Sequence, residues 1–373
     1  MPDRRNLPDT PALLVDLDTL QSNILKMQER ARKAGKSLRP HAKTHKCSTL
    51  ARHQLEAGAI GICTAKVGEA EGLVQAGITN VLITSPVSTH EKAERFIALA
   101  NTTAPHAAIV VDEPEGARLL AEVARQKKMS TRLNVFLDLD IGLMRTGVRP
   151  EHALELAQEI AGLAPALKLA GVQAYAGNLQ HIVDYEERRA ASRAAIDQAT
   201  EVFEALREKY PECGVLSTSG TGTHDIDFES PGPTELQVGS YCLMDAEYLA
   251  IRSKGAAGFE GFPPALRLLS SVVSTRHREE GFVTIDAGLK AVYRDGAAPT
   301  VLTPEYSHAT YDWFGDEHGR LIAKPGEALP AWGETLELVV SHCDPTINLF
   351  DELHIVKDGE VVDRWPVDLR GRG

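Results

Sequence analysis

Eight short apolar segments, separated by stretches with helical periodicity, restrict the fold of this chain more than any other feature. The segments cover residues 37–42, 60–65, 80–84, 106–111, 132–138, 168–175, 214–218 and 236–243. Most of them are rich in Val, Ile or Leu, as expected of parallel strands that are buried on both faces. The pattern favours an α/β fold of the TIM-like (β/α)8 barrel type, and a doubly wound sheet is the alternative that it leaves open.

Helical periodicity is clearest near the N-terminus. Apolar residues recur there at spacings of three and four, which places them along one face of a helix. They are Leu17, Leu20, Ile24, Met27, Ala31 and Ala34. The other stretches of this character are 89–101, 114–127, 150–163 and 183–208. Because helices and apolar segments alternate up to this point, we expect the barrel to span residues 17–252.

The pattern changes after about residue 255. Strand-like segments then follow one another with few helical patterns between them, and Gly, Pro and Asp mark the turns. These segments are 266–274, 281–286, 334–341, 353–356 and 361–365. We therefore predict a mostly antiparallel β domain over residues 253–373. A further strand at 12–16, within the N-terminal segment 1–16, is compatible with either domain.

Charge and cysteine content restrict the partners and the compartment. The formal net charge of −12 argues against nucleic acid or an anionic membrane surface as the main partner. The five cysteines are scattered and form no CxxC pair, so a disulfide framework is not expected. We find no signal peptide and no apolar stretch approaching the ~20 residues of a membrane span. These features together predict a soluble cytoplasmic protein.

Several of the predicted strands are followed by polar residues that can take part in catalysis or ligand binding. They lie at the end where barrels carry their active sites. The first predicted strand leads into Lys43, which stands between His41 and His45 in "LRPHAKTHK". The seventh leads into "SGTGT", residues 219–223, whose small residues let backbone N–H groups approach an anion. An amine and a phosphate cradle together suit an aldehyde cofactor that carries a phosphate, such as pyridoxal phosphate.

Several motifs along nearly the whole chain resemble those of one family. They are "TPALLVDLDTL", "LRPHAKTHK", "GVQAYAGNLQH", "SGTGT", "TELQVGSY", "TIDAGLK", "DEHG" and "SHCDPTINL". The chain resembles the D-threonine aldolase and D-serine dehydratase group of the alanine-racemase-like, fold-type III pyridoxal phosphate enzymes. The resemblance implies a cofactor-binding barrel followed by a β domain, in agreement with the fold predicted from the segments above.

The resemblance also implies a set of residues around the cofactor. Lys43 matches the Schiff-base lysine of the family, and His181 matches a histidine proposed there as the catalytic base. Arg145 matches an arginine near the phenolic oxygen of the cofactor, and Tyr175 matches a tyrosine beside it. The residues that match the phosphate-binding positions are Gly220, Thr221, Gly222 and Thr223, with Tyr241 close to them.

A metal site is implied near the C-terminus. His342 and Asp344 match the metal ligands of the family, and Asp316 of "DEHG" lies close to that site there. If residues 342–344 form a strand, alternation places His342 and Asp344 on one face and Cys343 on the other. The dehydratase branch resembles His-x-Cys, whereas aspartate at 344 favours the aldolase branch and Mn²⁺, with Mg²⁺, Co²⁺ or Zn²⁺ as alternatives.

The resemblance therefore implies a carbon–carbon lyase that cleaves D-β-hydroxy-α-amino acids of the D-threonine type into glycine and an aldehyde. A dehydratase of D-serine or D-3-hydroxyaspartate is the second candidate. An amino-acid racemase is third, because it needs a second base that we cannot assign. A non-catalytic carrier of pyridoxal phosphate is disfavoured, because such proteins resemble the barrel alone. The family resemblance also implies a homodimer.

Overall fold

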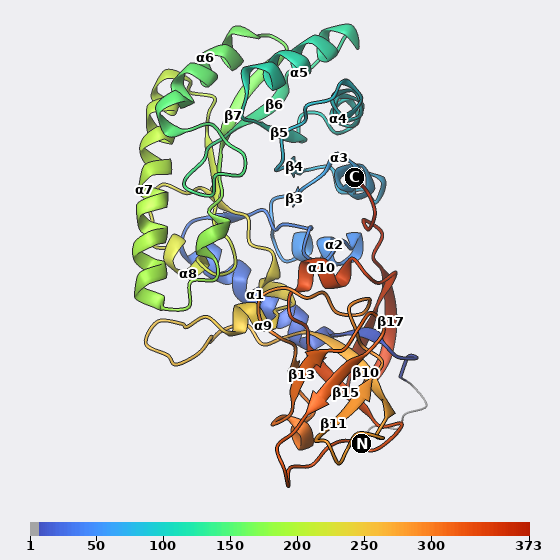
Figure 1. Cartoon of the computed structure of the whole chain (residues 1–373). Coiled ribbons are helices and arrows are strands. Elements are labelled where there is room, and N and C mark those ends of the chain that lie inside the picture. The colour runs from blue at the N-terminus through green and yellow to red at the C-terminus, as the bar shows by residue number, and fades with distance from the viewer. Residues whose placement is uncertain (1–6) are drawn as a thin grey trace. The chain divides into compact units, whose positions relative to one another are not determined.

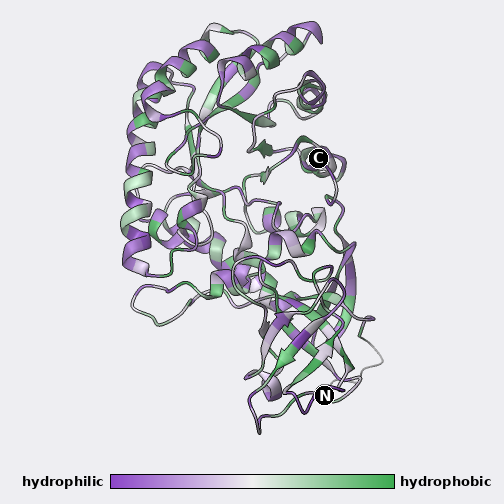
Figure 2. Cartoon of the chain, viewed as in Figure 1, coloured by the Kyte–Doolittle hydropathy of each residue, from purple (hydrophilic) through white to green (hydrophobic). Residues whose placement is uncertain are grey.

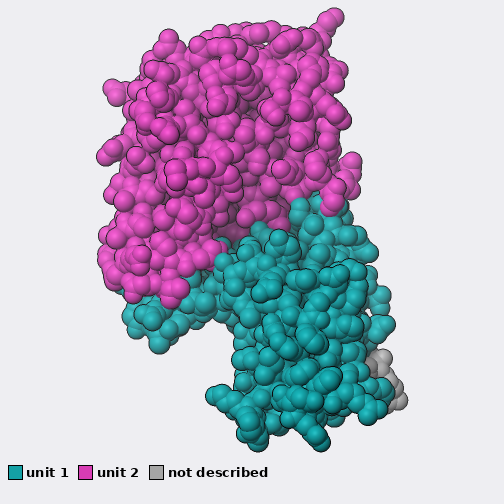
Figure 3. All heavy atoms as spheres, viewed as in Figure 1, with its two compact units in different colours: residues 1–25, 44–49, 240–370 teal, residues 26–43, 50–239, 371–373 magenta. Residues whose placement is uncertain are grey.

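The computed structural model describes residues 7–373 of the chain. Contacts between residues divide it into two compact units, coloured separately in Figure 3. The barrel unit comprises Lys26–Lys43, Leu50–Gly239 and Gly371–Gly373, and the β unit comprises Met1–Leu25, Thr44–Thr49 and Ser240–Arg370. The domain limits expected from sequence, 17–252 and 253–373, are two continuous ranges, whereas each unit here is made of several chain segments. These limits therefore stay a prediction.

Eight parallel strands form the sheet of the barrel unit, and each side-by-side pair in it is parallel. In spatial order they are β2 (Ser37–Leu38), β9 (Glu235–Leu236), β8 (Val215–Thr218), β7 (Leu167–Ala174), β6 (Leu133–Asp138), β5 (Ala108–Val111), β4 (Val81–Ile83) and β3 (Ile62–Thr64). A parallel bridge between His41 and Cys63 joins the segment after β2 to β3 and so connects the two ends of the sheet. The predicted α/β barrel is confirmed.

Helices follow the strands along the chain (Figure 1). They are α1 (Leu17–Lys33), α2 (Ser48–Glu56), α3 (Val67–Gln75), α4 (His90–Thr103), α5 (Pro114–Gln126), α6 (Ala153–Gly162), α7 (Tyr185–Lys209) and α8 (His224–Asp227). Figure 2 shows polar and apolar residues interleaved along these helices. In α7 the buried residues recur at spacings of three and four, from Tyr185 to Leu206, so one stripe of this helix is buried. Among residues 7–373, no helix is both long and apolar enough to cross a membrane.

A nine-stranded sheet forms most of the β unit. Its strands in spatial order are β11 (Phe282–Ile285), β14 (Gly319–Ile322), β13 (Thr310–Trp313), β12 (Thr300–Val301), β15 (Thr335–Val339), β10 (Leu266–Ser274), β1 (Ala12–Asp16), β16 (Glu352–Lys357) and β17 (Glu360–Pro366). All pairs are antiparallel except β1 with β16. Because β11 also pairs with β10, six of the strands close into a small barrel, which confirms the predicted antiparallel β domain.

Residues 342–344 do not form the strand that the alternation argument assumed. His342 precedes the short helix α10 (Cys343–Ile347) and has an extended backbone, with φ −145° and ψ 129°. Cys343 is nevertheless buried while His342 and Asp344 are partly exposed. The assumption of a strand was therefore wrong, although Nε2 of His342 and Oδ2 of Asp344 still lie 3.6 Å apart.

Candidate active site

Lys43 lies just beyond β2, at the carboxyl end of the parallel strands. The backbone N–H of Lys43 donates to Nδ1 of His41 at 3.3 Å. With Nδ1 accepting, His41 carries its proton on Nε2, which donates to Oγ1 of Thr84 at 3.0 Å. The Thr84 hydroxyl in turn donates to the carbonyl of Thr64 at 3.0 Å. His41 is buried and fixes the backbone that presents the lysine, so its role here is local and structural.

Two cationic side chains converge on the ring of Tyr175, which follows β7 directly. Nζ of Lys43 lies 6.0 Å from the centroid of this ring, and Cζ of Arg145 lies 5.8 Å from it. The three residues come from the ends of different strands and were each predicted from sequence. The structure brings them together, and a ring flanked by two cations suits a planar, anionic ligand.

The loop that carries Arg145 is held by its own hydrogen bonds. The hydroxyl of Thr146 donates to Oδ2 of Asp138 at 2.8 Å, and the N–H of Val148 donates to the carbonyl of Asp138 at 2.9 Å. Gly147 has φ 105°, and a Cβ there would lie 2.6 Å from the backbone nitrogen of Asp140. Burial raises the pKa of Asp138 to about 6, against the hydrogen bonds that favour its carboxylate.

Gln180 fastens the Gly- and Thr-rich loop that follows β8. Its Oε1 accepts from the N–H of Gly222 at 2.9 Å, and its Nε2 donates to Oγ1 of Thr223 at 3.2 Å. The threonine hydroxyl donates onward to the buried carboxylate of Asp227 at 2.6 Å. Thr221 and Thr223 are buried, so the loop presents hydroxyls and backbone amides within a compact setting. His181 is partly buried and directly follows the glutamine that holds this loop.

Three carboxylates surround the imidazole of His342 in the β unit. Nδ1 lies 3.0 Å from Oδ2 of Asp295 and 3.6 Å from Oε2 of Glu247, and Nε2 lies 3.6 Å from Oδ2 of Asp344. Glu247, Asp295 and His342 offer ligand atoms that all lie within 4.8 Å of one another. Sequence reasoning found His342 and Asp344 but missed Glu247 and Asp295, because only tertiary structure brings these distant segments together.

These carboxylates make the electrostatic potential at His342 strongly negative. Burial disfavours a charged His342, but Asp344, Asp245 and Asp295 outweigh it and raise the pKa of this imidazole to about 9. Burial, followed by the charges of Asp295 and Asp344, raises the pKa of Glu247. A cluster that favours positive charge this strongly is suited to a divalent cation held by nitrogen and oxygen ligands.

The remaining predicted residues lie elsewhere. Tyr241 is buried and packs edge-on against Phe262, with ring centroids 6.0 Å apart. Asp316 lies in the exposed turn between β13 and β14, where its carbonyl accepts from the N–H of Lys290 at 2.9 Å. Asp316 is not part of the cluster formed by Glu247, Asp295 and His342. The predicted roles of both residues stay predictions.

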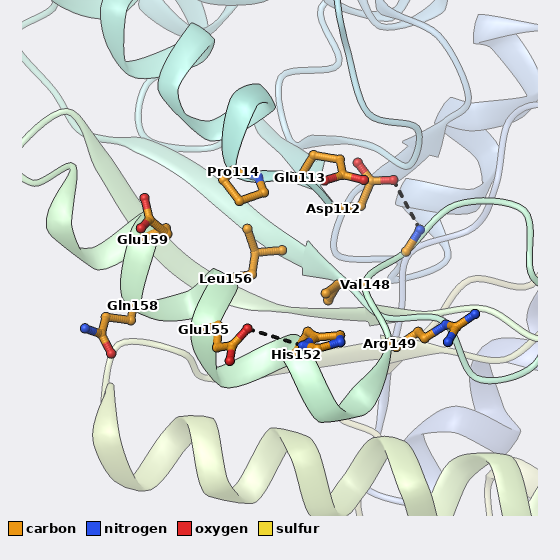
Figure 4. A pocket seen from close by; sticks show the side chains of 11 residues that line it. Asp112, Glu113, Pro114, Val148, Arg149, His152, Glu155, Leu156, Gln158 and Glu159 are labelled. Atoms are coloured by element: carbon orange, nitrogen blue, oxygen red, sulfur yellow. Dashed lines mark hydrogen bonds and ion pairs between the residues drawn. The ribbon is translucent and has the colours of Figure 1, made fainter.

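A separate pocket of the barrel unit is drawn in Figure 4. It contains none of the predicted site residues, and two of its polar side chains have partners within the pocket lining. His152 lies 3.2 Å from Glu155, and Asp112 accepts from the N–H of Gly147 at 3.2 Å. We therefore assign no role to this pocket in the chemistry of Lys43.

Comparisons with known proteins agree with this geometry. Residues 15–245 match the family of the alanine racemase N-terminal domain, and residues 265–356 match the serine dehydratase domain family. The D-threonine aldolase of an Arthrobacter species is 38% identical over 97% of this chain and 93% of its own length. The chain belongs to the D-threonine aldolase and D-serine dehydratase group of the alanine-racemase-like family.

Two further members of this family are similar over nearly the whole chain. The 3-hydroxy-D-aspartate aldolase of Paracoccus denitrificans is 36% identical, covering 98% of this chain and 92% of that protein. The crystal structure of D-threonine aldolase from Filomicrobium marinum superposes with a TM-score of 0.90 at 36% identity, covering 98% and 96% of the two chains. The fold of the chain is therefore the alanine-racemase-like, fold-type III architecture of pyridoxal phosphate enzymes.

Proposed function

We propose that this chain is a pyridoxal phosphate- and divalent-metal-dependent aldolase that cleaves D-β-hydroxy-α-amino acids of the D-threonine type into glycine and an aldehyde. The cluster around His342 is the observation that carries the proposal. A lysine and a cofactor-binding barrel are shared by enzymes with several activities, whereas cleavage next to a β-hydroxyl benefits from a cation that binds this hydroxyl. Two relatives that are 38% and 36% identical to this chain are named aldolases.

The residues at the strand ends of the barrel unit fit pyridoxal phosphate. Lys43 would hold the cofactor through its ε-amine, beside Tyr175 and Arg145, and the loop 219–223 would bind the phosphate. Thr64 supports this assignment, because its buried Oγ1 has no hydrogen-bond partner among the described residues and lies at the end of β3. When bound, the cofactor supplies an electron sink for the pair released as the Cα–Cβ bond breaks.

His342 and Asp344 would hold the cation, and we propose Mn²⁺ in preference to Mg²⁺, Co²⁺ or Zn²⁺. An imidazole and a carboxylate suit Mn²⁺, whereas a thiolate ligand would favour Zn²⁺. The thiol of Cys343 is buried and donates to the carbonyl of Met244 at 3.3 Å, so it is turned away from this role. With the cation held there, the β-hydroxyl becomes more acidic, and His181 would accept its proton.

A dehydratase is the second candidate, because residues 265–356 match the serine dehydratase domain family. A dehydratase would release ammonia and a 2-oxo acid instead of glycine and an aldehyde. A homodimer and a cytoplasmic location remain predictions from the family resemblance and the composition.

Product analysis tests the proposal. Purified protein with pyridoxal phosphate and Mn²⁺ is expected to convert D-threonine into equal amounts of acetaldehyde and glycine. EDTA should abolish the reaction and added Mn²⁺ should restore it. D-3-hydroxyaspartate and D-serine, assayed separately, define the side chain that is accepted. Ammonia and 2-oxo acid without glycine would overturn the aldolase proposal in favour of the dehydratase.

Substitution of Gly222 by alanine is expected to weaken cofactor binding ~5–150-fold, since a loop displacement costs ~1–3 kcal/mol. A Cβ at Gly222 would lie 1.9 Å from the carbonyl oxygen of Gln180, so the loop must move. Fluorescence titration of the apoenzyme with pyridoxal phosphate measures the change. Gly162→Ala is the matched control, because a Cβ there meets no atom within 4 Å. Equal affinity in both variants would argue against a phosphate-binding role for this loop.

A further inference from the structure

The two ring nitrogens of His342 have different surroundings. Nδ1 lies 3.0 Å from Oδ2 of Asp295, the length of an N–H···O hydrogen bond. Nε2 lies 3.6 Å from Oδ2 of Asp344, which is longer than a hydrogen bond.

An imidazole that binds a metal is neutral, because the metal takes the place of one proton. It then carries a single proton, and its other nitrogen supplies the lone pair for the metal. If Asp295 accepts the proton on Nδ1, the lone pair is on Nε2, beside Asp344. Carboxylate groups that hold a metal-binding histidine in this way fix its tautomer and raise its basicity. The hydrogen-bond distance therefore singles out Asp295 as the carboxylate that orients the ring. Asp344 lies beside the nitrogen that then has the lone pair.

Hydrogen bonds hold the backbone around the imidazole of His342. Glu247 belongs to α9 (Ala246–Leu249), whose first residue, Ala246, donates its N–H to the carbonyl of Val340 at 3.0 Å. Asp245 caps the same helix at the N–H of Tyr248 and also accepts from the N–H of Cys343 at 2.9 Å. The segment with Glu247 is thereby joined directly to the segment with His342.

A glycine follows Asp295 and permits the close approach of Glu247. Gly296 has φ 52°, and a Cβ there would lie 2.6 Å from Oε1 of Glu247. Asp295 itself is exposed, whereas Glu247 is partly buried. Asp295 thus lies at hydrogen-bond distance from Nδ1 of His342, and Glu247 lies slightly farther from the same nitrogen.

We infer that Asp295, supported by Glu247, positions His342 by accepting the proton on Nδ1, so that Nε2 binds the cation together with Asp344. The inference rests on the metal site of the proposed function and extends it to two residues outside the ligand pair. Asp295 and Glu247 are positioning residues: they act through His342 and leave the cation to the other edge of the ring.

Direct titration of the cation tests this assignment without measuring activity. Holoenzyme with pyridoxal phosphate is stripped with EDTA, freed of chelator and titrated with Mn²⁺, while electron paramagnetic resonance records the free ion. Asp295→Ala is expected to weaken Mn²⁺ binding ~10–100-fold. Asp295→Asn should fall between this variant and wild type, because its amide oxygen can still accept the proton on Nδ1. His342→Ala and Asp344→Ala should remove measurable binding.

Glu279→Ala is the control for the loss of one negative charge, since Glu279 is exposed in the turn between β10 and β11. Asp295→Ala binding Mn²⁺ as tightly as this control would overturn the inference while leaving the metal site intact. Loss of binding in Asp295→Ala and Glu247→Ala, with normal binding in Asp344→Ala, would also overturn it and place the cation at Nδ1. A wild-type enzyme that takes up no Mn²⁺ would overturn the metal site itself.

Discussion

Lys43→Ala is expected to abolish the cleavage of D-threonine and to remove the visible absorption of the bound cofactor. Loss of a nucleophile that takes part in covalent chemistry lowers kcat by factors of ~10³–10⁶. Lys43→Arg should be equally inactive, because a guanidinium retains the charge but is not a nucleophile at neutral pH. Spectra and the rate of acetaldehyde formation, recorded on the same samples, measure both effects.

The geometry explains why we assign the covalent role to Lys43 and not to the residues next to it. His41 fixes the backbone of Lys43, and the amine lies near the ring of Tyr175 together with Arg145. Lys33→Ala is the control, because Lys33 is an exposed helix residue paired with Glu29. A Lys43→Ala enzyme that keeps a tenth of the wild-type rate, or that retains the cofactor spectrum, would contradict the assignment of this lysine.

The barrel could be predicted from sequence because most of its strand segments are rich in Val, Ile or Leu. Each of the eight predicted segments contains or overlaps an observed strand, but the eighth was predicted over 236–243 and β9 covers only Glu235–Leu236. Gly239 and the helical turn Ser240–Cys242 end this strand early. In the β unit, β12, β13 and β14 were missed. They have two to four residues each, which is too short to show an alternation of polar and apolar residues.

Site residues could be predicted from sequence where they belong to a motif. Residues that only the tertiary structure brings to the site could not be predicted. Lys43, Tyr175 and Arg145 each follow a strand, and parallel strands bring such ends to one edge of a sheet. Glu247 and Asp295 reach His342 from 95 and 47 residues away, by the numbering, and neither belongs to a recognisable pattern. Their contribution depends on how α9 and the loop before Gly296 pack, which composition and periodicity do not encode.

Breaking a buried ion pair should strongly destabilise the barrel unit. The guanidinium of Arg39 donates to both carboxylate oxygens of Glu235, at 2.9 and 3.1 Å, and both side chains are almost fully buried. Oε1 of Glu235 also accepts from the hydroxyl of Ser217 at 2.7 Å. Burial opposes the charge of Arg39, but Glu235 outweighs it, so the pKa of this guanidinium is raised.

The pair belongs to a chain of hydrogen bonds that crosses the interior of the barrel. Nε2 of Gln237 donates to Ser217 at 2.9 Å and to Gln173 at 3.2 Å. Nε2 of Gln173 donates to Oδ1 of Asp138 at 2.8 Å, next to the loop that carries Arg145. The linked side chains are buried, and the bond from Gln237 to Gln173 spans the strand β8 that lies between their segments. We therefore expect a change at Glu235 to affect the residues at the strand ends.

Glu235→Gln is therefore expected to lower the free energy of unfolding by ~3–5 kcal/mol, because it leaves the charge of Arg39 buried without its partner. Urea denaturation followed by circular dichroism measures the loss. The matched control is Glu212→Gln, which breaks an exposed pair that also has two hydrogen bonds, donated by Arg132, and should change little. The double variant Arg39→Met, Glu235→Leu should be more stable than Glu235→Gln, since it buries no charge. Equal losses in the two single variants would show that burial of the Arg39 pair adds nothing to its effect on stability.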